Sequence, residues 1–181
     1  MDKESKYYIG LRFGLLTGVI YVVLLFIRYR YVASSPVQFS FFAMATYIII
    51  LMLYLFAGIA RKKQLGGYGD MKEIFQAIFI VILITELFYI IFSLVYLKWI
   101  DPLFWENFKT ISRIYYEKEK LSVEQMEQAM KGFKDVDQET KPMGLLKGYG
   151  YSVIIDSLFG FIIASIVRKK NPIAGKALER T

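Results

Sequence analysis

Two carboxylic acids stand inside long apolar runs, where ionisable side chains are rare. Glu86 lies in an apolar run of about residues 74–97, and Asp156 lies in one of about residues 145–167. At about 1.5 Å of rise per helical residue, Glu86 lies about 20 Å from the start of its run and Asp156 about 16 Å from the end of its own. Both acids are therefore predicted near the middle of a bilayer, where a carboxylate costs at least about 2.5 kcal/mol unless it is protonated, paired or hydrated.

These acids have a structural and a functional interpretation. In the structural one, each acid is neutral and hydrogen-bonded across helices to a Ser, Thr, Tyr or backbone carbonyl. In the functional one, Glu86 and Asp156 form a proton or cation site between the third and fourth spans. Arg12, a few residues into the first apolar run, is expected to snorkel to the headgroups, and pairing with one of the acids is the alternative.

Other reaction chemistry has few residues to use. The chain has no Cys and no His, so it has no thiolate nucleophile and lacks the commonest metal ligand and general base. Gly67-Tyr68-Gly69-Asp70 matches the Gly-x-Gly-Asp element of intramembrane aspartyl proteases, but a glycine turn followed by a helix cap explains it better. We expect a non-enzymatic protein without catalytic residues, metal site or cofactor.

The acids are positioned by apolar segments long enough to be transmembrane helices. The chain has 181 residues, of which 56% are apolar, and four runs reach the length of about 20 residues that a span needs. Helices are expected because a bilayer offers no water to unpaired backbone groups, and short first and second connections make neighbouring spans antiparallel. The predicted fold is an all-α up-down bundle of four spans in a single membrane domain, residues 1–181. The spans are about residues 8–31, 37–60, 74–97 and 145–167.

The third connection, residues 98–144, is rich in charge and must lie outside the hydrocarbon. Two sets of apolar residues in it recur at helical spacing, which predicts an amphipathic helical hairpin. This hairpin either lies on the bundle or headgroups, or docks a partner through the adaptable Met126 and Met130, with Phe133 as a further docking candidate. The first set is Phe104, Phe108, Ile111 and Tyr115; the second follows the Ser122 cap and contains Val123, Met126, Met130 and Phe133.

Small residues recur every four positions on the first and last spans. In lipid, such stripes let helix backbones approach closely, so they predict helix packing faces. The stripe on the first span is Gly10, Gly14 and Gly18, and the stripe on the fourth is Gly148, Ser152, Asp156, Gly160 and Ala164.

The formal charge of +7 does not indicate nucleic-acid binding, because Lys and Arg flank the apolar runs instead of forming one basic patch. Anionic lipid headgroups are the expected partner. Basic residues are divided almost evenly between the two sides of the membrane. Because Arg61-Lys62-Lys63 and Arg168-Lys169-Lys170 directly abut helix ends, we expect both termini in the cytoplasm and the hairpin outside. The first run is too long for a cleavable signal peptide, so we expect a retained span.

Several short motifs, in order, resemble one family. They are Gly66-Gly67-Tyr68 followed by residues 72–75, then Ile100-Asp101-Pro102, then residues 122–130, and a last glycine-bearing helix closed by Arg168-Lys169-Lys170. With these, the chain resembles the bacterial membrane family catalogued as domain of unknown function 4199. The resemblance implies a small four-helix inner-membrane protein without an assigned reaction, and it supplies no functional residue.

Two functional hypotheses follow. The first is a non-enzymatic bundle that acts through self-association, or as an accessory subunit of another membrane protein. The alternative is a proton-linked small-solute transporter or channel centred on Glu86 and Asp156, which would need a dimer to enclose a pathway.

Overall fold

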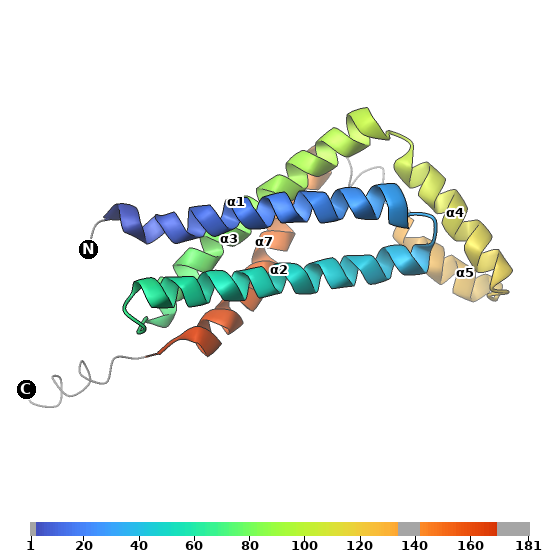
Figure 1. Cartoon of the computed structure of the whole chain (residues 1–181). Helices are drawn as coiled ribbons and strands as arrows, with labels where there is room; N and C mark the ends of the chain where they lie inside the picture. The colour runs from blue at the N-terminus through green and yellow to red at the C-terminus, as the bar shows by residue number, and fades with distance from the viewer. Residues whose placement is uncertain (1–2, 134–141, 170–181) are drawn as a thin grey trace, which may run out of the picture. The chain divides into compact units, whose positions relative to one another are not determined.

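A computed structural model describes residues 3–133 and 142–169 of the chain (Figure 1). These residues form helices joined by short turns, and no strand occurs in the two described ranges. Four of the helices are long and apolar enough to cross a membrane, so the protein is a multi-pass membrane protein, as predicted. They are α1 (Lys3–Ile27), which continues as a π-helical turn (Arg28–Val32), α2 (Pro36–Gln64), α3 (Met71–Val95), which continues as a second π-helical turn (Tyr96–Ile100), and α7 (Pro142–Val167).

The helices run past the predicted spans at several ends. Helix α2 was predicted to end at Ala60 but includes the basic run after it and ends at Gln64. Helix α7 begins at Pro142, three residues before the predicted Leu145. Hydropathy marks only the part of a helix that suits lipid, whereas backbone hydrogen bonding continues until a turn ends it. Pro142 is suited to the first turn of a helix because its φ is fixed and it has no N–H to leave unpaired.

The chain forms two compact units, which are described separately. Unit 1 consists of Met1–Gly18, Ile49–Glu86 and Ser152–Thr181, and unit 2 of Val19–Ile48 and Leu87–Tyr151. Each of the four long helices contributes residues to both units. Statements about either unit refer to its described residues.

Helix α3 is the central element of unit 1. Its residues Ile74, Ile78 and Ile82 are fully buried. Contacts along α3 show the direction of its neighbouring helices. Gly10 of α1 lies against Ile80, and Gly14, one turn later, lies against Ile84, so α1 and α3 run parallel. On the other side, Gly160 of α7 meets Ile82, and the ring of Phe161 contacts that of Phe75, so α7 runs antiparallel to α3. Unit 1 therefore has the predicted up-down arrangement.

The turn between α2 and α3 uses the predicted glycines. Gly66 and Gly67 have φ of +78° and +86°, in the left-handed region that favours glycine. The Gly67 N–H donates to the Lys62 carbonyl at 3.0 Å, which closes the end of α2. Two backbone hydrogen bonds, of 3.0 and 3.3 Å, join Gly69 to Lys169 just after α7. The turn is therefore tied to the end of the last span.

Unit 2 is built around aromatic rings. Ring centroids lie 4.5 Å apart in the pair Tyr29–Phe104 and in the pair Phe39–Phe108. Phe104 and Phe108 belong to α4 (Phe104–Lys118), so these contacts hold the first half of α4 against the π-helical turn that follows α1 and against the part of α2 in this unit. The buried cluster contains Leu25, Tyr29, Phe39, Phe92, Tyr96, Phe104 and Phe108.

The two predicted amphipathic helices are present, but their apolar faces are only partly buried. Helix α5 (Val123–Met130) starts with the predicted capping box, in which the Gln125 N–H donates to Ser122 Oγ at 3.2 Å and the Ser122 N–H donates to Gln125 Oε1 at 3.0 Å. None of its residues is buried, and Val123 is 80% exposed. In α4 the buried residues are Phe104, Phe108 and Ser112. Ile111, which was predicted to lie on the apolar face, is exposed.

Candidate functional site

The two intramembrane acids come together in unit 1. Glu86 on α3 is 5% exposed and Asp156 on α7 is 3% exposed. The two carboxyl groups are close enough to interact electrostatically. The antiparallel packing of α3 and α7 thus places Glu86 and Asp156 at the same level. This agrees with the similar membrane depths that were predicted for the two residues from the sequence.

Hydroxyl groups from two helices contact this pair. Tyr54 on α2 is fully buried, and its hydroxyl donates to Asp156 Oδ2 at 2.9 Å. Ser152, one helical turn before Asp156, lies within side-chain hydrogen-bonding reach of Glu86. We call Tyr54, Glu86, Ser152 and Asp156 the polar cluster. It connects α2, α3 and α7 within unit 1.

The polar cluster is suited to holding helices together. Hydrogen bonds between transmembrane helices contribute about 0.6 kcal/mol on average and up to about 1.7 kcal/mol. The geometry therefore matches the structural interpretation of the acids, in which a hydroxyl from another helix contacts each carboxyl group.

Two basic residues lie in surroundings of different kinds. Arg12 on α1 is exposed, and no ion pair in the described part of the chain joins it to Glu86 or Asp156, which leaves its side chain free to reach headgroups. Arg61 was expected among the cations that flank the spans, but it is 1% exposed. Its Nη1 donates to Gln64 Oε1 at 2.6 Å. Position at a helix end thus does not establish contact with headgroups.

The predicted packing stripe of α1 fits against the isoleucines of α3. A Cβ added at Gly10 would lie 2.8 Å from Ile80 Cβ, and one at Gly14 would lie 2.7 Å from Ile84 Cδ1. Gly18 is buried as well. Only glycine permits this approach of the two helices.

The predicted stripe of α7 divides into two parts. A Cβ at Gly160 would lie 3.0 Å from Ile82 Cδ1, and Ala164 is fully buried, so this end of the stripe is a packing face. Gly148 is exposed and has no neighbour within 4 Å of an added Cβ. Each four-residue step turns a helical stripe by about 40°, so the three steps from Gly148 to Gly160 turn it by about 120°. The two glycines consequently lie on different faces.

Two contributors were missed from the sequence. Tyr54 supplies the hydroxyl that bonds Asp156, and Gly58, four residues later on α2, would place a Cβ 3.1 Å from Ile78 Cδ1. The signal in the sequence was the spacing of Tyr54 and Gly58, which lie one helical turn apart in the second apolar run and could have predicted a packing face there.

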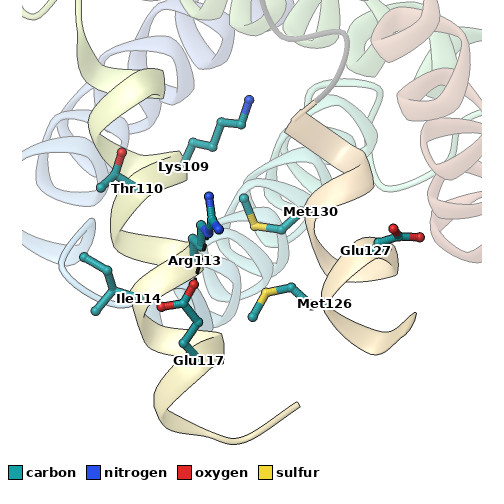
Figure 2. A pocket seen from close by; sticks show the side chains of 8 residues that line it. All are labelled: Lys109, Thr110, Arg113, Ile114, Glu117, Met126, Glu127 and Met130. Carbon is teal, nitrogen blue, oxygen red and sulfur yellow. Dashed lines mark hydrogen bonds and ion pairs between the residues drawn. The ribbon is translucent and has the colours of Figure 1, made fainter. Parts of the chain in front are cut away.

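The three predicted docking residues lie in two different surroundings. Met126 and Met130 line a groove of about 600 Å³ between α4 and α5, and Figure 2 shows both side chains extending from α5 toward α4. Across the groove, Arg113 Nε lies 3.0 Å from Glu117 Oε1 in an ion pair. Phe133 instead packs its ring against Phe108 at 5.8 Å between centroids. The accessible part of the predicted docking surface is therefore the methionine groove.

Comparison with known proteins gives one finding on family. The family model described as "Protein of unknown function (DUF4199)" matches residues 12–169. This confirms the resemblance found in the motifs. No curated protein and no solved structure matches the chain.

Proposed function

The chain belongs to the DUF4199 family, and we propose that it is a non-enzymatic membrane bundle that acts through contacts, either with a second copy or as an accessory subunit of another membrane protein. The observation that carries the proposal is the methionine groove between α4 and α5. Helix α5 has no buried residue, and an uncovered apolar face of this kind is typical of a surface that binds a partner. Met126 and Met130 suit such a surface because methionine is flexible and adapts to irregular shapes.

The chemistry of the spans supports a role without catalysis. The chain has no His or Cys, and the two buried acids of unit 1 are engaged with hydroxyl groups. The hydroxyl groups of the polar cluster contact carboxyl groups on other helices, which is the arrangement of hydrogen bonds between transmembrane helices, and no group of three or more His, Cys, Asp or Glu in the described residues could hold a metal ion.

Site-specific crosslinking in native membranes tests the proposal. A photoreactive residue at Met126 or Met130 is expected to give a crosslinked product, whereas the same residue at the exposed Glu124 of α5, which does not line the groove, is the matched control. A product with the mass of a dimer indicates self-association, and one that contains another membrane protein indicates a subunit role. Met130→Glu should abolish either product. A strictly monomeric species on native gels, without products at either methionine, would exclude the proposal.

The competing function is a proton-linked solute transporter or channel. The observation that favours it is the juxtaposition of Glu86 and Asp156 within spans, since intramembrane acids are often functional. The test measures pH-driven flux in proteoliposomes for the parent protein, Glu86→Gln and Asp156→Asn. If the parent shows no flux, or neither substitution alters it, this function is eliminated.

We also propose that the protein lies in an inner (cytoplasmic) membrane with both termini in the cytoplasm, because Arg61-Lys62-Lys63 follow the apolar part of α2. The chain has no Cys, so single cysteines report topology without background. Lys120→Cys is expected to react with an impermeant maleimide in intact cells, and Lys63→Cys only after permeabilisation. The reverse pattern would invert the orientation.

A further inference from the structure

Unit 2 contains a second cavity, separate from the methionine groove. Its volume is about 320 Å³, which falls at the lower end of the range typical of small-molecule sites. The rings of Phe39, Trp105, Phe108 and Phe133 form much of its wall. Arg28 also lines it, and none of the described residues that line it is acidic. The cavity thus combines an aromatic body with one fixed positive charge.

Contacts within unit 2 hold Arg28 in place. Its guanidinium carbon lies 3.9 Å from the centroid of the Phe39 ring, and its Nε donates to the Phe39 carbonyl at 3.2 Å. Its electrostatic neighbours are the tyrosines Tyr21, Tyr29 and Tyr89. In the described part of the chain, no Asp or Glu forms an ion pair with it. The charge is therefore positioned by a ring and a carbonyl, and no carboxylate of residues 3–133 or 142–169 pairs with it.

Two further donors line the same cavity. Ser93 is 2% exposed, and neither Ser93 Oγ nor Trp105 Nε1 has a hydrogen-bond partner among the described residues. A buried donor without a partner is costly, and the indole N–H can only donate. The cavity consequently has donors at Arg28 and Trp105 in its wall, beside the Ser93 hydroxyl, which can also bond a carbonyl of its own helix, and it suits a ligand with acceptor groups.

We propose that this cavity binds a small amphipathic anion, with a carboxylate or phosphate group at Arg28, Ser93 and Trp105 and an apolar body among the aromatic rings. Charge-assisted hydrogen bonds to Arg favour such groups, and aromatic walls favour the apolar body. Arg28 lies in the last part of the span Tyr7–Val32, and the end of a span is where amphipathic anions partition from the bilayer. The anion comes either from the membrane, as a free fatty acid, or from solution, as a small aromatic acid.

Quenching of Trp105 fluorescence tests the proposal on the full chain in detergent micelles. The chain has two tryptophans, and Trp99 is 68% exposed, so Trp99→Phe leaves Trp105 as the only reporter. ω-Bromoundecanoate should quench Trp105 saturably, whereas neutral ω-bromoundecanol and inorganic phosphate should not compete for the site. Displacement by undecanoate alone indicates a membrane source, and displacement by benzoate indicates a soluble one. Equal, non-saturable quenching by the acid and the alcohol would overturn the proposal.

Variants separate a binding role from a packing role. Arg28→Gln should weaken bromoundecanoate binding by about tenfold or more, the loss expected for one charged hydrogen bond, while Arg30→Gln removes an equal charge from an exposed neighbour and should leave binding unchanged. Because Arg28 also packs on Phe39, Ser93→Ala is the second variant, and it should weaken binding several-fold with the thermal unfolding of the parent retained. Unchanged binding in both Arg28→Gln and Ser93→Ala would refute the site.

Discussion

Alanine substitution of helical glycines tests the packing of unit 1. At Gly10 an added Cβ would lie 2.8 Å from Ile80 Cβ and 3.0 Å from the Ala77 carbonyl oxygen, and neither atom can move without the backbone. At Gly14 it would lie 2.7 Å from Ile84 Cδ1 and 2.9 Å from Ile84 Cβ. Both substitutions therefore require α1 and α3 to separate or to shift.

Two glycines of α7 provide the comparison. At Gly160 the nearest atoms are Ile82 Cδ1 at 3.0 Å and Ile78 Cγ2 at 3.1 Å, which are ends of side chains and can give by a few tenths of an ångström. At Gly148 no atom lies within 4 Å, so an added methyl group meets open space. Gly148→Ala is thus the matched control for the change of residue type.

The expected magnitudes follow from two opposing effects. Alanine is favoured over glycine in a helix by about 1 kcal/mol at every site, so this gain cancels when each variant is compared with Gly148→Ala. Overpacking costs about 1–3 kcal/mol where neighbours cannot relax. We expect Gly10→Ala and Gly14→Ala to be less stable than Gly148→Ala by about 1–3 kcal/mol, and Gly160→Ala by no more than about 1 kcal/mol.

Equilibrium unfolding of the purified protein in mixed dodecylmaltoside–SDS micelles, followed by circular dichroism, measures these differences. The order of stability should be Gly148→Ala, then Gly160→Ala, then the two α1 variants. Ile82→Val removes the atom nearest to the Cβ at position 160, so it should relieve the effect of Gly160→Ala. If all four variants agree within about 0.5 kcal/mol, the close approach of α1 to α3 is refuted.

Three other substitutions have defined outcomes. Tyr54→Phe removes the donor to Asp156 and should lower stability in the same assay by about 0.5–2 kcal/mol, while Tyr151→Phe, at a 70% exposed residue, should have no effect. Ser122→Ala breaks the capping box of α5, so amide exchange should accelerate in α5 without a change in global unfolding, the local cost being about 1 kcal/mol. Gly67→Ala at a φ of +86° should destabilise by about 1–2 kcal/mol, because alanine is strained there, and stability equal to the parent would contradict the turn.

The spans could be predicted because lipid requires long apolar helices, but the faces of those helices could not. In a soluble protein, polar residues mark the outer face, whereas lipid accepts the same residues as the protein interior. Ile78 and Ile91 belong to one helix and one residue type, yet Ile78 is fully buried and Ile91 is 52% exposed. Hydropathy gives the depth of a residue in the membrane and leaves its direction around the helix open.

Polar residues carry more information in lipid because each needs a partner. Glu86 and Asp156 could be assigned to the same depth from the sequence, and the structure brings them together. The choice of Tyr54 as donor depends on the rotation of α2, which apolar residues on all sides of that helix do not determine. For the same reason, the sequence did not show that Gly148 and Gly160, which belong to one stripe, lie in different surroundings.

The buried polar groups also indicate where binding should be sought. Thr17 and Thr85 of unit 1 have no hydrogen-bond partner in the described residues, but a helical threonine can rotate to bond a carbonyl of its preceding turn. Trp105 Nε1 in unit 2 has no such option, because its N–H direction is fixed by the ring and the backbone carbonyls of α4 are bonded along the helix. Beside it, Arg28 holds a charge without an ion pair in the described part of the chain. In unit 1, hydroxyl groups of the polar cluster contact both acids, whereas Arg28 and Trp105 of unit 2 line a cavity and have no carboxylate partner among the described residues, so the cavity of unit 2 is where we expect an anionic ligand to bind.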